Sequence, residues 1–274
     1  MPKPARTSDS QAGGSGGSSE ALKLPLSSLT LVLPAHNEAE NLPSVIAEAR
    51  AMFSTLALVS EIVLVDDGST DRTAELATGL CQDAGIPLRL IRHESKQGYG
   101  ATVGDGLRAA RGDFVAFTDA DGQFDLGEFP MMARLLDTAD LVGGYRRQRE
   151  DAFFRSVVSF VFNTLLRFLY GLKVRDVDCA MKIMRGSFLR SIDLQARSAL
   201  INAELYWKAR RGGWRTAQVA VTHRPRVAGV RSGARPRAIL RAVKELFLFR
   251  MKLRSWHPDA AARVQEPHHN SGVG

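Results

Sequence analysis

Two aspartates, two residues apart, form the sharpest chemical motif in the sequence. Asp119 and Asp121 directly follow the apolar stretch 114–118, and Gln123 comes two residues later. Carboxylate oxygens are the ligands that hard divalent cations prefer, and such ions usually share them with substrate phosphates. The amide oxygen of Gln123 could add a third ligand. An Asp-x-Asp triplet alone is often only a solvated acidic turn, so its place after a predicted strand gives the motif its weight.

Polar residues also follow three other apolar runs. These segments are PAHNE at 34–38, DDGSTD at 66–71 and HESKQG at 93–98. Asp66 or Asp67 could accept hydrogen bonds from the base or the ribose of a nucleotide, whereas Asp71 suits the start of a helix as a cap. Four successive apolar runs therefore end in acids, amides or glycines, which predicts a polar ligand site.

The glycine-rich stretch around Lys96 is a weaker motif. Lys96 and the glycines after it loosely resemble a phosphate-cradling loop, but the spacing G-x-x-x-x-G-K-[ST] is absent. We keep Lys96 as a candidate contact for the nucleotide. The glycines at 98, 100 and 104 are expected instead to let a helix pack closely on the sheet.

A parallel sheet would bring these polar segments together. Short apolar runs alternate with amphipathic segments of roughly 10 to 15 residues, which is typical of βαβ units. The runs are continuously apolar, as expected for strands covered on both faces. The predicted strands are 29–33, 62–65, 87–91, 114–117 and 139–142, and the predicted helices are 40–53, 72–84 and 99–110. Ligands bind at the carboxyl ends of strands in such open sheets, so the polar segments should share one edge.

The second half of the chain has a different pattern. The sequence predicts a long apolar helix at 153–170, a strand at 179–184, a helix at 202–211, a strand at 214–221 and a basic amphipathic helix at 237–254. We therefore expect four regions: a disordered tail at 1–27, one α/β domain at 28–222, a basic loop with a membrane-proximal amphipathic helix at 223–256, and a disordered tail at 257–274.

The overall charge indicates an anionic partner. The formal net charge is +8, which suits nucleic acid, a membrane surface or a phosphorylated substrate. No nucleic-acid-binding pattern accompanies the charge, and without a metal the acidic strand ends would repel phosphate, so a nucleic acid is not expected. Cys81 and Cys179 are too few for a disulfide framework and are expected to be reduced thiols of a cytosolic protein.

A second expectation concerns the membrane. Residues 1–20 lack the apolar core of a signal peptide, and no stretch reaches the ~18 to 20 uncharged apolar residues of a spanning helix. Residues 223–254 include ten Arg or Lys and one acid, and the helix within them separates apolar from basic side chains, which is typical of an interfacial helix. We expect a peripheral protein at the cytoplasmic face of a membrane. The alternative is that this helix packs on its own domain.

Together, these motifs resemble those of the family 2 glycosyltransferases of the GT-A fold. The matching stretches are PAHNEAENL at 34–42, VDDGSTDRT at 65–73, KQGYGATVGDGLRAARGD at 96–113 and DADGQ at 119–123. DVDCAMKIMR at 176–185 and HRPRVAGVRSG at 223–233 are similar to the dolichol- or polyprenyl-phosphate mannosyltransferase-like branch. The resemblance implies an α/β, Rossmann-like domain with a mainly parallel sheet flanked by helices, and C-terminal amphipathic helices.

The resemblance also implies roles for the residues at the strand ends. The donor is implied to be a GDP- or UDP-sugar. The residues that would hold its nucleotide are Pro34, Ala35, Glu38 and either Asp66 or Asp67. The residues that would hold Mg²⁺ or Mn²⁺ with the sugar diphosphate are Asp119, Asp121 and Gln123.

Cationic residues are implied to bind the remaining phosphates. Arg146, and Arg155 with Ser159, would meet the phosphate of a polyprenyl-phosphate acceptor. The spacing of four residues puts Arg155 and Ser159 on one helix face. Arg226 and Arg231 match a basic loop that closes over the diphosphate.

The implied reaction is an inverting transfer of a hexose, mannose or glucose, to polyprenyl phosphate. A lipid phosphate is already anionic and needs positioning cations rather than a base. If the acceptor were instead a hydroxyl of a saccharide or cell-envelope glycan, a carboxylate base would be needed. Asp178 and Glu204 are candidates for it, although Glu204 could equally be structural.

Two expectations lie beyond the reaction itself. The alternative of another class is a non-catalytic basic protein that binds a membrane or nucleic acid. A homo-oligomer or a separate membrane partner is the expected assembly.

Overall fold

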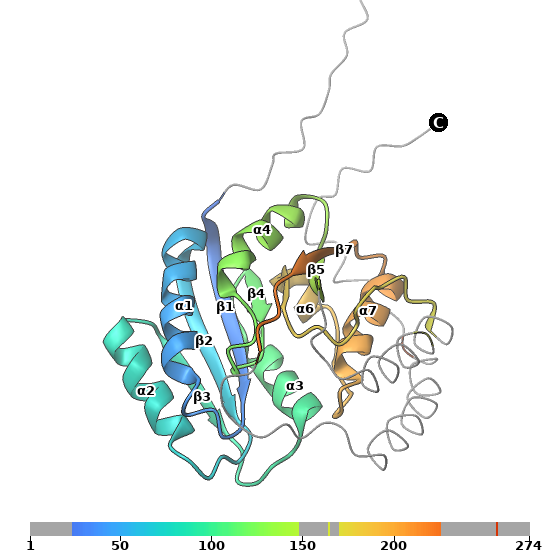
Figure 1. Ribbon diagram of the computed structural model, residues 1–274. Coiled ribbons are helices and arrows are strands. Elements are labelled where there is room, and N and C mark those ends of the chain that lie inside the picture. The colour runs from blue at the N-terminus through green and yellow to red at the C-terminus, as the bar shows by residue number, and fades with distance from the viewer. Residues whose placement is uncertain (1–23, 148–163, 165–169, 226–255, 257–274) are drawn as a thin grey trace, which may run out of the picture.

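The computed structural model describes residues 24–147 and 170–225, together with residues 164 and 256. They form a seven-stranded sheet flanked by helices, in the order β3-β2-β1-β4-β6-β5-β7 (Figure 1). The strands are β1 (Leu26–Ala35), β2 (Ala57–Asp66), β3 (Leu88–Arg92), β4 (Phe114–Phe117), β5 (Leu141–Arg146), β6 (Lys182–Arg185) and β7 (Thr216–Val221). The helices are α1 (Leu42–Leu56), α2 (Thr73–Ala84), α3 (Tyr99–Ala109), α4 (Phe129–Arg134), α6 (Gly186–Arg190) and α7 (Ile201–Gly212), with short turns η1 (Leu126–Glu128) and η2 (Leu135–Asp137). The predicted α/β class with a mainly parallel sheet is confirmed.

β1 is the central strand of the parallel part of the sheet. It pairs in parallel with β2 on one side and β4 on the other, with Leu31 opposite Ile62 and Ala116. Leu31, Val32 and Leu33 are all fully buried. A strand covered on both faces needs consecutive apolar residues, and this is the pattern that predicted the strand.

The connections create a topological switch point between β1 and β4. The chain moves outward from β1 to β2 and β3 through α1 and α2, and then crosses back to β4 through α3. Right-handed crossovers place α3 on the face opposite α1 and α2, where it packs beside α7 (Figure 1). Open α/β sheets bind ligands at such a point, outside the carboxyl ends of the strands.

The second half of the sheet contains one reversed strand. β6 lies between β4 and β5 and is antiparallel to both, while β7 pairs in parallel with β5. The carboxyl ends of β4 and β5 therefore face the same edge of the sheet. The strand predicted at 179–184 begins only at Lys182, since the carbonyl of Cys179 accepts a hydrogen bond from the Lys182 ammonium instead of a strand partner.

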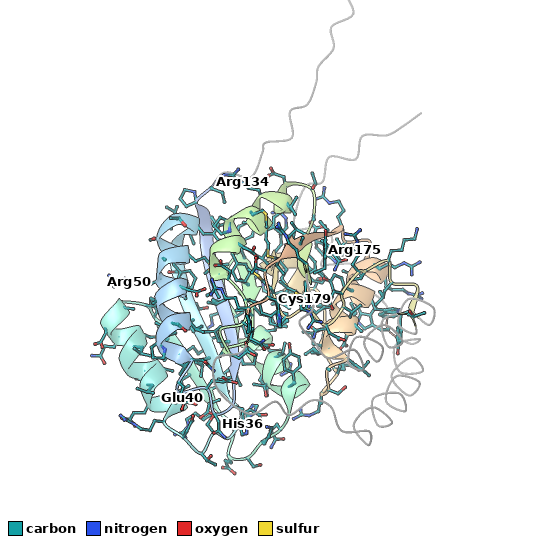
Figure 2. The ribbon with its side chains drawn as sticks, in the orientation of Figure 1. His36, Glu40, Arg50, Arg134, Arg175 and Cys179 are labelled. Carbon is teal, nitrogen blue, oxygen red and sulfur yellow. The ribbon has the colours of Figure 1, made fainter. Side chains whose placement is uncertain are left out.

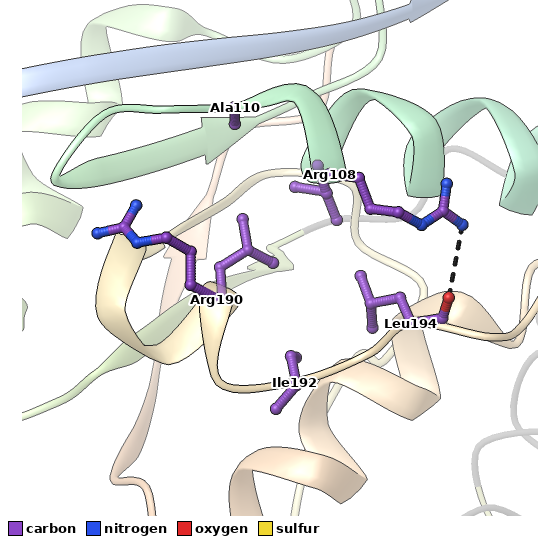
Figure 3. Close-up of a pocket in the computed structure, with 7 residues that line it drawn as sticks. Arg108, Ala110, Arg190, Ile192 and Leu194 are labelled. Carbon is purple, nitrogen blue, oxygen red and sulfur yellow. Dashed lines mark hydrogen bonds between the residues drawn. The ribbon is translucent and has the colours of Figure 1, made fainter. Parts of the chain in front are cut away.

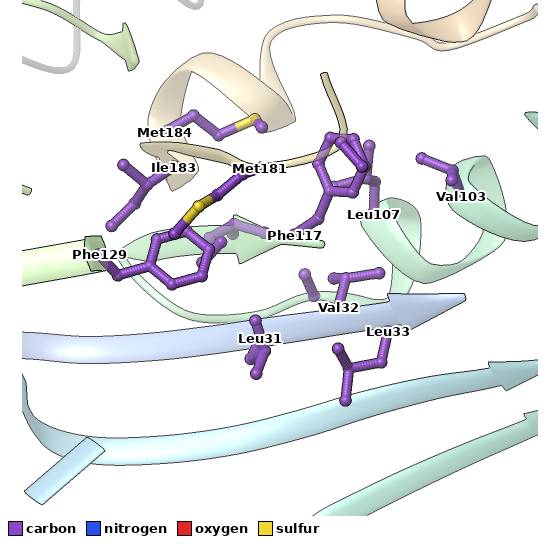
Figure 4. Packing of buried hydrophobic residues seen from close by; sticks show 14 of the residues in the cluster. Leu31, Val32, Leu33, Val103, Leu107, Phe117, Phe129, Met181, Ile183 and Met184 are labelled. Atoms are coloured by element: carbon purple, nitrogen blue, oxygen red, sulfur yellow. The ribbon is translucent and has the colours of Figure 1, made fainter. Parts of the chain in front are cut away.

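The apolar core joins the sheet to the helices on both faces. Side chains from β1, α3, β4 and β6 meet in the region of Figure 4, among them Val32, Leu107, Phe117 and Met184. α1 buries one face at the spacing of three or four residues that helical geometry requires. Its buried residues are Leu42, Val45, Ile46, Ala49, Met52, Phe53 and Leu56.

Gly100 in α3 is required by the close approach of another backbone. A Cβ at this position would lie 2.1 Å from the carbonyl oxygen of Ser198. The glycines of α3 therefore serve more than the predicted packing on the sheet: Gly100 contacts the segment before α7, while Gly106 contacts Val32 of β1.

We expect Gly100→Ala to lower the free energy of unfolding by about 1–3 kcal/mol, because overpacking forces the backbone apart. Gly79→Ala in α2 is the control, since its Cβ would meet nothing within 4 Å. It should stabilise the helix by up to about 1 kcal/mol. Urea unfolding of both variants measures the difference, and a Gly100→Ala variant as stable as the parent would contradict the packing argument.

Several expectations concern residues beyond those described. The helices predicted at 153–170 and 237–254 lie almost wholly outside the described residues, as do the two tails. The predicted end of the first tail at residue 27 is wrong, because Leu26 is buried and begins β1 opposite Ala57. Within the described part of the chain, no helix combines the length and apolar character needed to span a bilayer.

Candidate active site

The Asp-x-Asp turn lies at the switch point between β1 and β4. The backbone N–H of Thr118 donates to the Val32 carbonyl at 3.2 Å, and that of Ala120 donates to the Pro34 carbonyl at 3.4 Å. These bonds extend the pairing of β4 with β1 past the last strand residue, so Asp119 and Asp121 come beside the first polar segment. The structure thus brings together two of the motifs that the sequence singled out.

Asp119 has the electrostatics of a cation site. Burial raises the pKa of its carboxyl to about 7, and the charges of Asp121 and Glu38 also raise it. Lys182 and a hydrogen bond from Tyr99 act in the opposite direction. Three carboxylates that repel one another in a partly buried place gain from a divalent cation between them.

A buried hydrogen-bonded network lies behind Asp119. The Tyr99 hydroxyl, at the start of α3, interacts with both Asp119 and Asn202. The side-chain oxygen of Asn202, on α7, accepts from the Lys182 ammonium at 2.9 Å. Lys182 is fully buried and also donates to the carbonyls of Val177 and Cys179. The network therefore ties α3, α7 and the segment before β6 to the acidic turn.

The donor set fits a metal that shares its ligands with a substrate. Within residues 24–147 and 170–225, no three His, Cys, Asp or Glu side chains are arranged to hold an ion by themselves. Mg²⁺ is usually bound by one or two carboxylates plus substrate phosphates rather than by a complete protein cage. Asp119 and Asp121 match that arrangement.

Gln123 has a structural role that the sequence did not predict. Its side-chain amide donates to the carbonyl of Arg224 at 3.0 Å, and its own carbonyl accepts from the Arg224 N–H at 2.6 Å. The Arg224 guanidinium pairs with Glu48 on α1 at 2.5 Å and with Asp125 at 2.9 Å. Gln123 thus joins the acidic turn to the start of the basic segment, and its role as a metal ligand stays a prediction.

The two aspartates after β2 are largely engaged within the protein. Asp66 accepts from the Ser69 N–H at 2.9 Å and from Arg92 at 3.3 Å. Asp67 accepts from the N–H groups of Gln97 at 2.7 Å and Gly98 at 2.9 Å. Their carboxylates therefore shape the loops around the predicted nucleotide site, and direct contact with a nucleotide stays a prediction.

His93 completes this arrangement between two carboxylates. Its Nδ1 lies 2.8 Å from an oxygen of Asp67, and its Nε2 lies 3.0 Å from an oxygen of Asp105 on α3. Burial alone would raise the pKa of Asp67, but the hydrogen bonds from His93, Gln97 and Gly98 outweigh burial and lower it. Asp67 is therefore a firmly ionised anchor for the 93–98 loop.

Hydrogen bonds hold the polar segment at 34–38, after β1, against the one at 66–71, after β2. Asn37 has a left-handed backbone with φ of 57°, and its side-chain oxygen accepts from the Thr70 N–H at 2.8 Å. Asp71 accepts from the N–H groups of Thr73, the first residue of α2, at 3.0 Å and of Ala39 at 3.2 Å. It therefore bonds to the start of the helix, although Arg72 rather than Asp71 is the N-cap residue. Glu38 is buried and accepts from Asn41 at 2.6 Å. Figure 2 shows His36 and Glu40 at this end of the molecule.

Lys96 and the two residues at the end of β1 complete the described nucleotide candidates. Lys96 is exposed, whereas Pro34 and Ala35 are buried at the carboxyl end of β1. The backbone around Lys96 packs against Gly68, where an added Cβ would lie 2.8 Å from the backbone nitrogen of Lys96. The segments after β1, β2 and β3 are therefore adjacent, as predicted. The contacts of these residues with a nucleotide stay predictions.

Arg146 forms a two-bonded pair with Asp176. Its Nε and one Nη donate to the two carboxylate oxygens at 2.8 and 3.1 Å. Burial would lower the pKa of Arg146, but this pairing outweighs burial and raises it. Asp178 follows two residues later, and its charge acts on both Tyr99 and Lys182. Arg146 and Asp178 therefore lie at the same edge as the acidic pair.

Glu204 occupies a structural position rather than the site. It is fully buried in α7 and pairs with the equally buried Lys208 at 2.9 Å. Its oxygens also accept from the N–H groups of Gln195 at 3.0 Å and Ala196 at 2.8 Å. This environment supports the structural alternative and leaves no hydrogen-bonding capacity for a base.

The remaining predicted residues are outside the described part of the chain. They are Arg155, Ser159, Arg226 and Arg231.

The pocket drawn in Figure 3 is separate from these residues. It lies between the end of α3 and the segment after α6, and Arg108 donates there to the Leu194 carbonyl at 3.5 Å. The end of α3 is near the amino end of β4, at the edge of the sheet opposite the acidic pair. The candidate active site is therefore not this pocket.

Comparison with known proteins defines the class of the molecule. The family model for glycosyl transferase family 2 matches residues 30–193, which is more than half of the chain. The protein is thus a glycosyltransferase, as the motifs at the strand ends predict. The chain belongs to glycosyl transferase family 2.

Two curated relatives act on lipid phosphates according to their names. Dodecaprenyl-phosphate galacturonate synthase from Rhizobium johnstonii is 32% identical over 239 residues, covering 84% of this chain and 69% of the relative. Undecaprenyl-phosphate 4-deoxy-4-formamido-L-arabinose transferase from Serratia proteamaculans is 28% identical over 207 residues, covering 75% of this chain and 62% of the relative. The match thus spans less than two thirds of the second relative.

Solved structures share the fold. Glucosyl-3-phosphoglycerate synthase from Mycobacterium tuberculosis, solved with Mn²⁺, uridine diphosphate and phosphoglyceric acid, superposes with a TM-score of 0.62 at 24% identity. The match covers 85% of this chain and 80% of that one. A second structure of that enzyme, with Mg²⁺ and uridine diphosphate, gives a TM-score of 0.60 at 23% identity and covers 85% and 81%. The predicted GT-A fold is confirmed.

The buried network behind Asp119 yields a prediction for Tyr99. We expect Tyr99→Phe to weaken Mn²⁺ binding in the presence of uridine diphosphate roughly 10- to 100-fold, since residues that orient metal ligands have effects of that size. Tyr145→Phe is the control, because Tyr145 lies on β5 under Arg175. Titration of Mn²⁺ followed by electron paramagnetic resonance measures the affinity. Equal affinities in both variants would contradict a role for Tyr99.

Proposed function

We propose that the protein transfers a sugar from a nucleotide-sugar to the phosphate of a polyprenyl phosphate. The observation that carries this proposal is the acidic pair at the switch point, with Arg146 and Asp176 at the same edge of the sheet. The names of the two relatives, which both refer to a polyprenyl phosphate, support the acceptor class. The cytoplasmic face of a membrane would be the place where such a lipid is met.

Each described residue would have a definite task in this reaction. Asp119 and Asp121 would hold Mg²⁺ or Mn²⁺, which when bound supplies positive charge to the leaving diphosphate. The loops anchored by Asp67 would form the wall around the nucleotide. Arg146, oriented by Asp176, has five N–H donors and uses two of them in that pair, so its remaining donors would meet the acceptor phosphate.

A lipid phosphate would attack without losing a proton, so this reaction needs no general base. Asp178 would then act only through its charge, and the arginine would have to offset the repulsion between acceptor and donor phosphates. The sugar is expected to be mannose or glucose. The names of the two relatives refer to the transfer of galacturonate and of a formamido-arabinose. A galacturonate donor is therefore also tested.

The test uses purified full-length protein, Mn²⁺ or Mg²⁺, and a short polyprenyl phosphate dispersed in detergent. Radiolabelled GDP-mannose, UDP-glucose and UDP-galacturonate are supplied in turn, and label extracted into organic solvent is counted. Label in the lipid, absent with Asp121→Asn, is the expected result. Metal-dependent release of free sugar without lipid label would overturn the lipid acceptor and favour a hydroxyl acceptor with Asp178 as base.

A further inference from the structure

One face of the domain is basic and carries two tryptophans. Lys173, Arg175, Arg210 and Arg211 are exposed, and Trp207 and Trp256 are half-buried beside them. We call these six residues the basic face. Asp176, next to Arg175, and Glu204 on α7 are buried and paired with cations, so neither carboxylate lies among the exposed basic side chains.

Side-chain contacts connect residues of the basic face. Arg210 on α7 donates to the carbonyl of Tyr170 at 3.1 Å and also to that of Gly171. Lys173 is two residues further on, so its Cα lies within ~7 Å of Gly171. The Arg211 guanidinium lies 5.9 Å from the centre of the Trp207 ring. The segment that begins at Tyr170 therefore passes the end of α7 at Tyr170 and Gly171.

The basic face reaches the edge of the sheet that holds the candidate site. The Arg175 guanidinium lies 4.7 Å from the centre of the Tyr145 ring, near the carboxyl end of β5. The next residue, Asp176, pairs with Arg146. A partner seated on the basic face would thus border the residues proposed to meet the acceptor.

Tyr170 and Trp256, at each of which the described chain resumes after a gap, both lie at this face. The sequence before Tyr170 includes the apolar run that begins at Phe153, and the Tyr170 carbonyl is bound by Arg210. The sequence before Trp256 includes the basic run after residue 225. The rings of Trp256 and Trp207 meet edge to face with centres 5.8 Å apart.

We propose that the basic face binds the surface of an anionic lipid bilayer. Basic side chains near an anionic leaflet each strengthen binding roughly fivefold, and tryptophan favours the level of the lipid head groups. The residues that precede Tyr170 in the sequence are mostly apolar and those that precede Trp256 are rich in Arg and Lys, a combination that suits a bilayer better than a nucleic acid. The purpose of this binding, delivery of a lipid phosphate, rests on the proposed function, but the binding itself does not.

The test compares two double variants of the full chain with equal charge. Lys173→Glu with Arg211→Glu alters the basic face. Arg50→Glu with Arg134→Glu alters exposed positions on α1 and α4, across the sheet from α7 (Figure 2). Each pair lowers the net charge by four, from +8 to +4. Thermal unfolding first establishes that both variants fold.

Sedimentation with vesicles of phosphatidylglycerol and phosphatidylcholine measures binding, with pure phosphatidylcholine as reference. We expect the basic-face variant to bind at least tenfold more weakly than the parent, and the α1/α4 variant to change less than threefold. Equal losses in both variants, no dependence on phosphatidylglycerol, or displacement of the parent from vesicles by single-stranded RNA through the same two residues would overturn the proposal.

The two proposals fail in different ways. Transfer to detergent-dispersed polyprenyl phosphate should stay within twofold of the parent in the basic-face variant, because Lys173 and Arg211 are not in the site. If the parent binds anionic vesicles through this face but transfers no sugar to lipid, the proposed function fails, whereas the proposal that the basic face binds a bilayer is supported. If the parent transfers sugar to lipid but does not bind anionic vesicles, the proposed function is supported and the membrane-binding face is overturned.

Discussion

Asp121→Asn should reduce sugar transfer by about a thousandfold while the protein stays folded. Charge stabilisation by a bound metal is worth several kcal/mol, and about 4 kcal/mol corresponds to a factor of a thousand in rate. The variant removes one of the two carboxylates at the switch point. It keeps the side-chain oxygen that accepts from the Gln123 N–H at 3.1 Å, so the turn should keep its shape.

The matched control is Glu40→Gln. Glu40 is an exposed carboxylate at the same end of the molecule (Figure 2), outside the acidic pair. It should change transfer less than twofold. Chelation of the metal with EDTA should lower the parent to the level of Asp121→Asn and have little further effect on that variant. If the parent kept full activity in EDTA, the metal-dependent mechanism would be refuted.

The parallel half of the fold followed from the sequence because its rules are local. Leu31, Val32 and Leu33 are consecutive and apolar, and only a strand buried on both faces uses such a run. Once strands alternate with helices, the handedness of the crossovers and the switch point follow. Boundaries were less predictable. β2 begins at Ala57 rather than 62, since its first residues pair with β1 although Leu58 and Val59 are exposed.

The grouping of the candidate site residues at one edge of the sheet was predictable, and the hydrogen bonds among them were less so. The strand ends marked Asp119 and Asp121 correctly as neighbours of the first polar segment. The sequence could not show that Asp67 is occupied, because its partners Gln97 and Gly98 are about thirty residues away. A carboxylate after a strand has the same local pattern whether it binds a ligand or a neighbouring loop.

Three polar residues behind the site were missed for a related reason. Tyr99, Lys182 and Asn202 lie on three different elements, and only the packing of α3 against α7 brings them together. One signal was present. Lys182 is a single charge inside the apolar stretch CAMKIM, and a lysine buried there requires polar partners. A lone charge within a predicted strand is therefore a useful pointer to a buried network.

Glu204 is a titratable residue whose contacts all hold parts of the protein together. Its carboxylate holds Lys208 and the backbone before α7, while the Lys208 ammonium donates to the Asp193 carbonyl. The segment fixed in this way includes Leu194, which Arg108 contacts, and leads to the backbone packed on Gly100. The ion pair thus positions the connection between α6 and α7 against α3.

We expect Glu204→Gln to lower the free energy of unfolding by about 3–5 kcal/mol, because it leaves the Lys208 charge buried without its partner. The melting temperature should fall on the order of 10 °C. Glu204→Gln combined with Lys208→Met removes both charges and should recover a large part of that loss, since an apolar replacement of a buried pair costs little. Calorimetry of the single and double variants measures the coupling.

The same variants separate the two roles considered for Glu204. A structural residue predicts that the folded fraction of Glu204→Gln, assayed at low temperature, transfers sugar at close to the parent rate. A catalytic base predicts a loss of 100-fold or more in both the single and the double variant, with the melting temperature unchanged. Since both oxygens of Glu204 are already bound by backbone N–H groups and Lys208, stability rather than turnover should respond to the substitution.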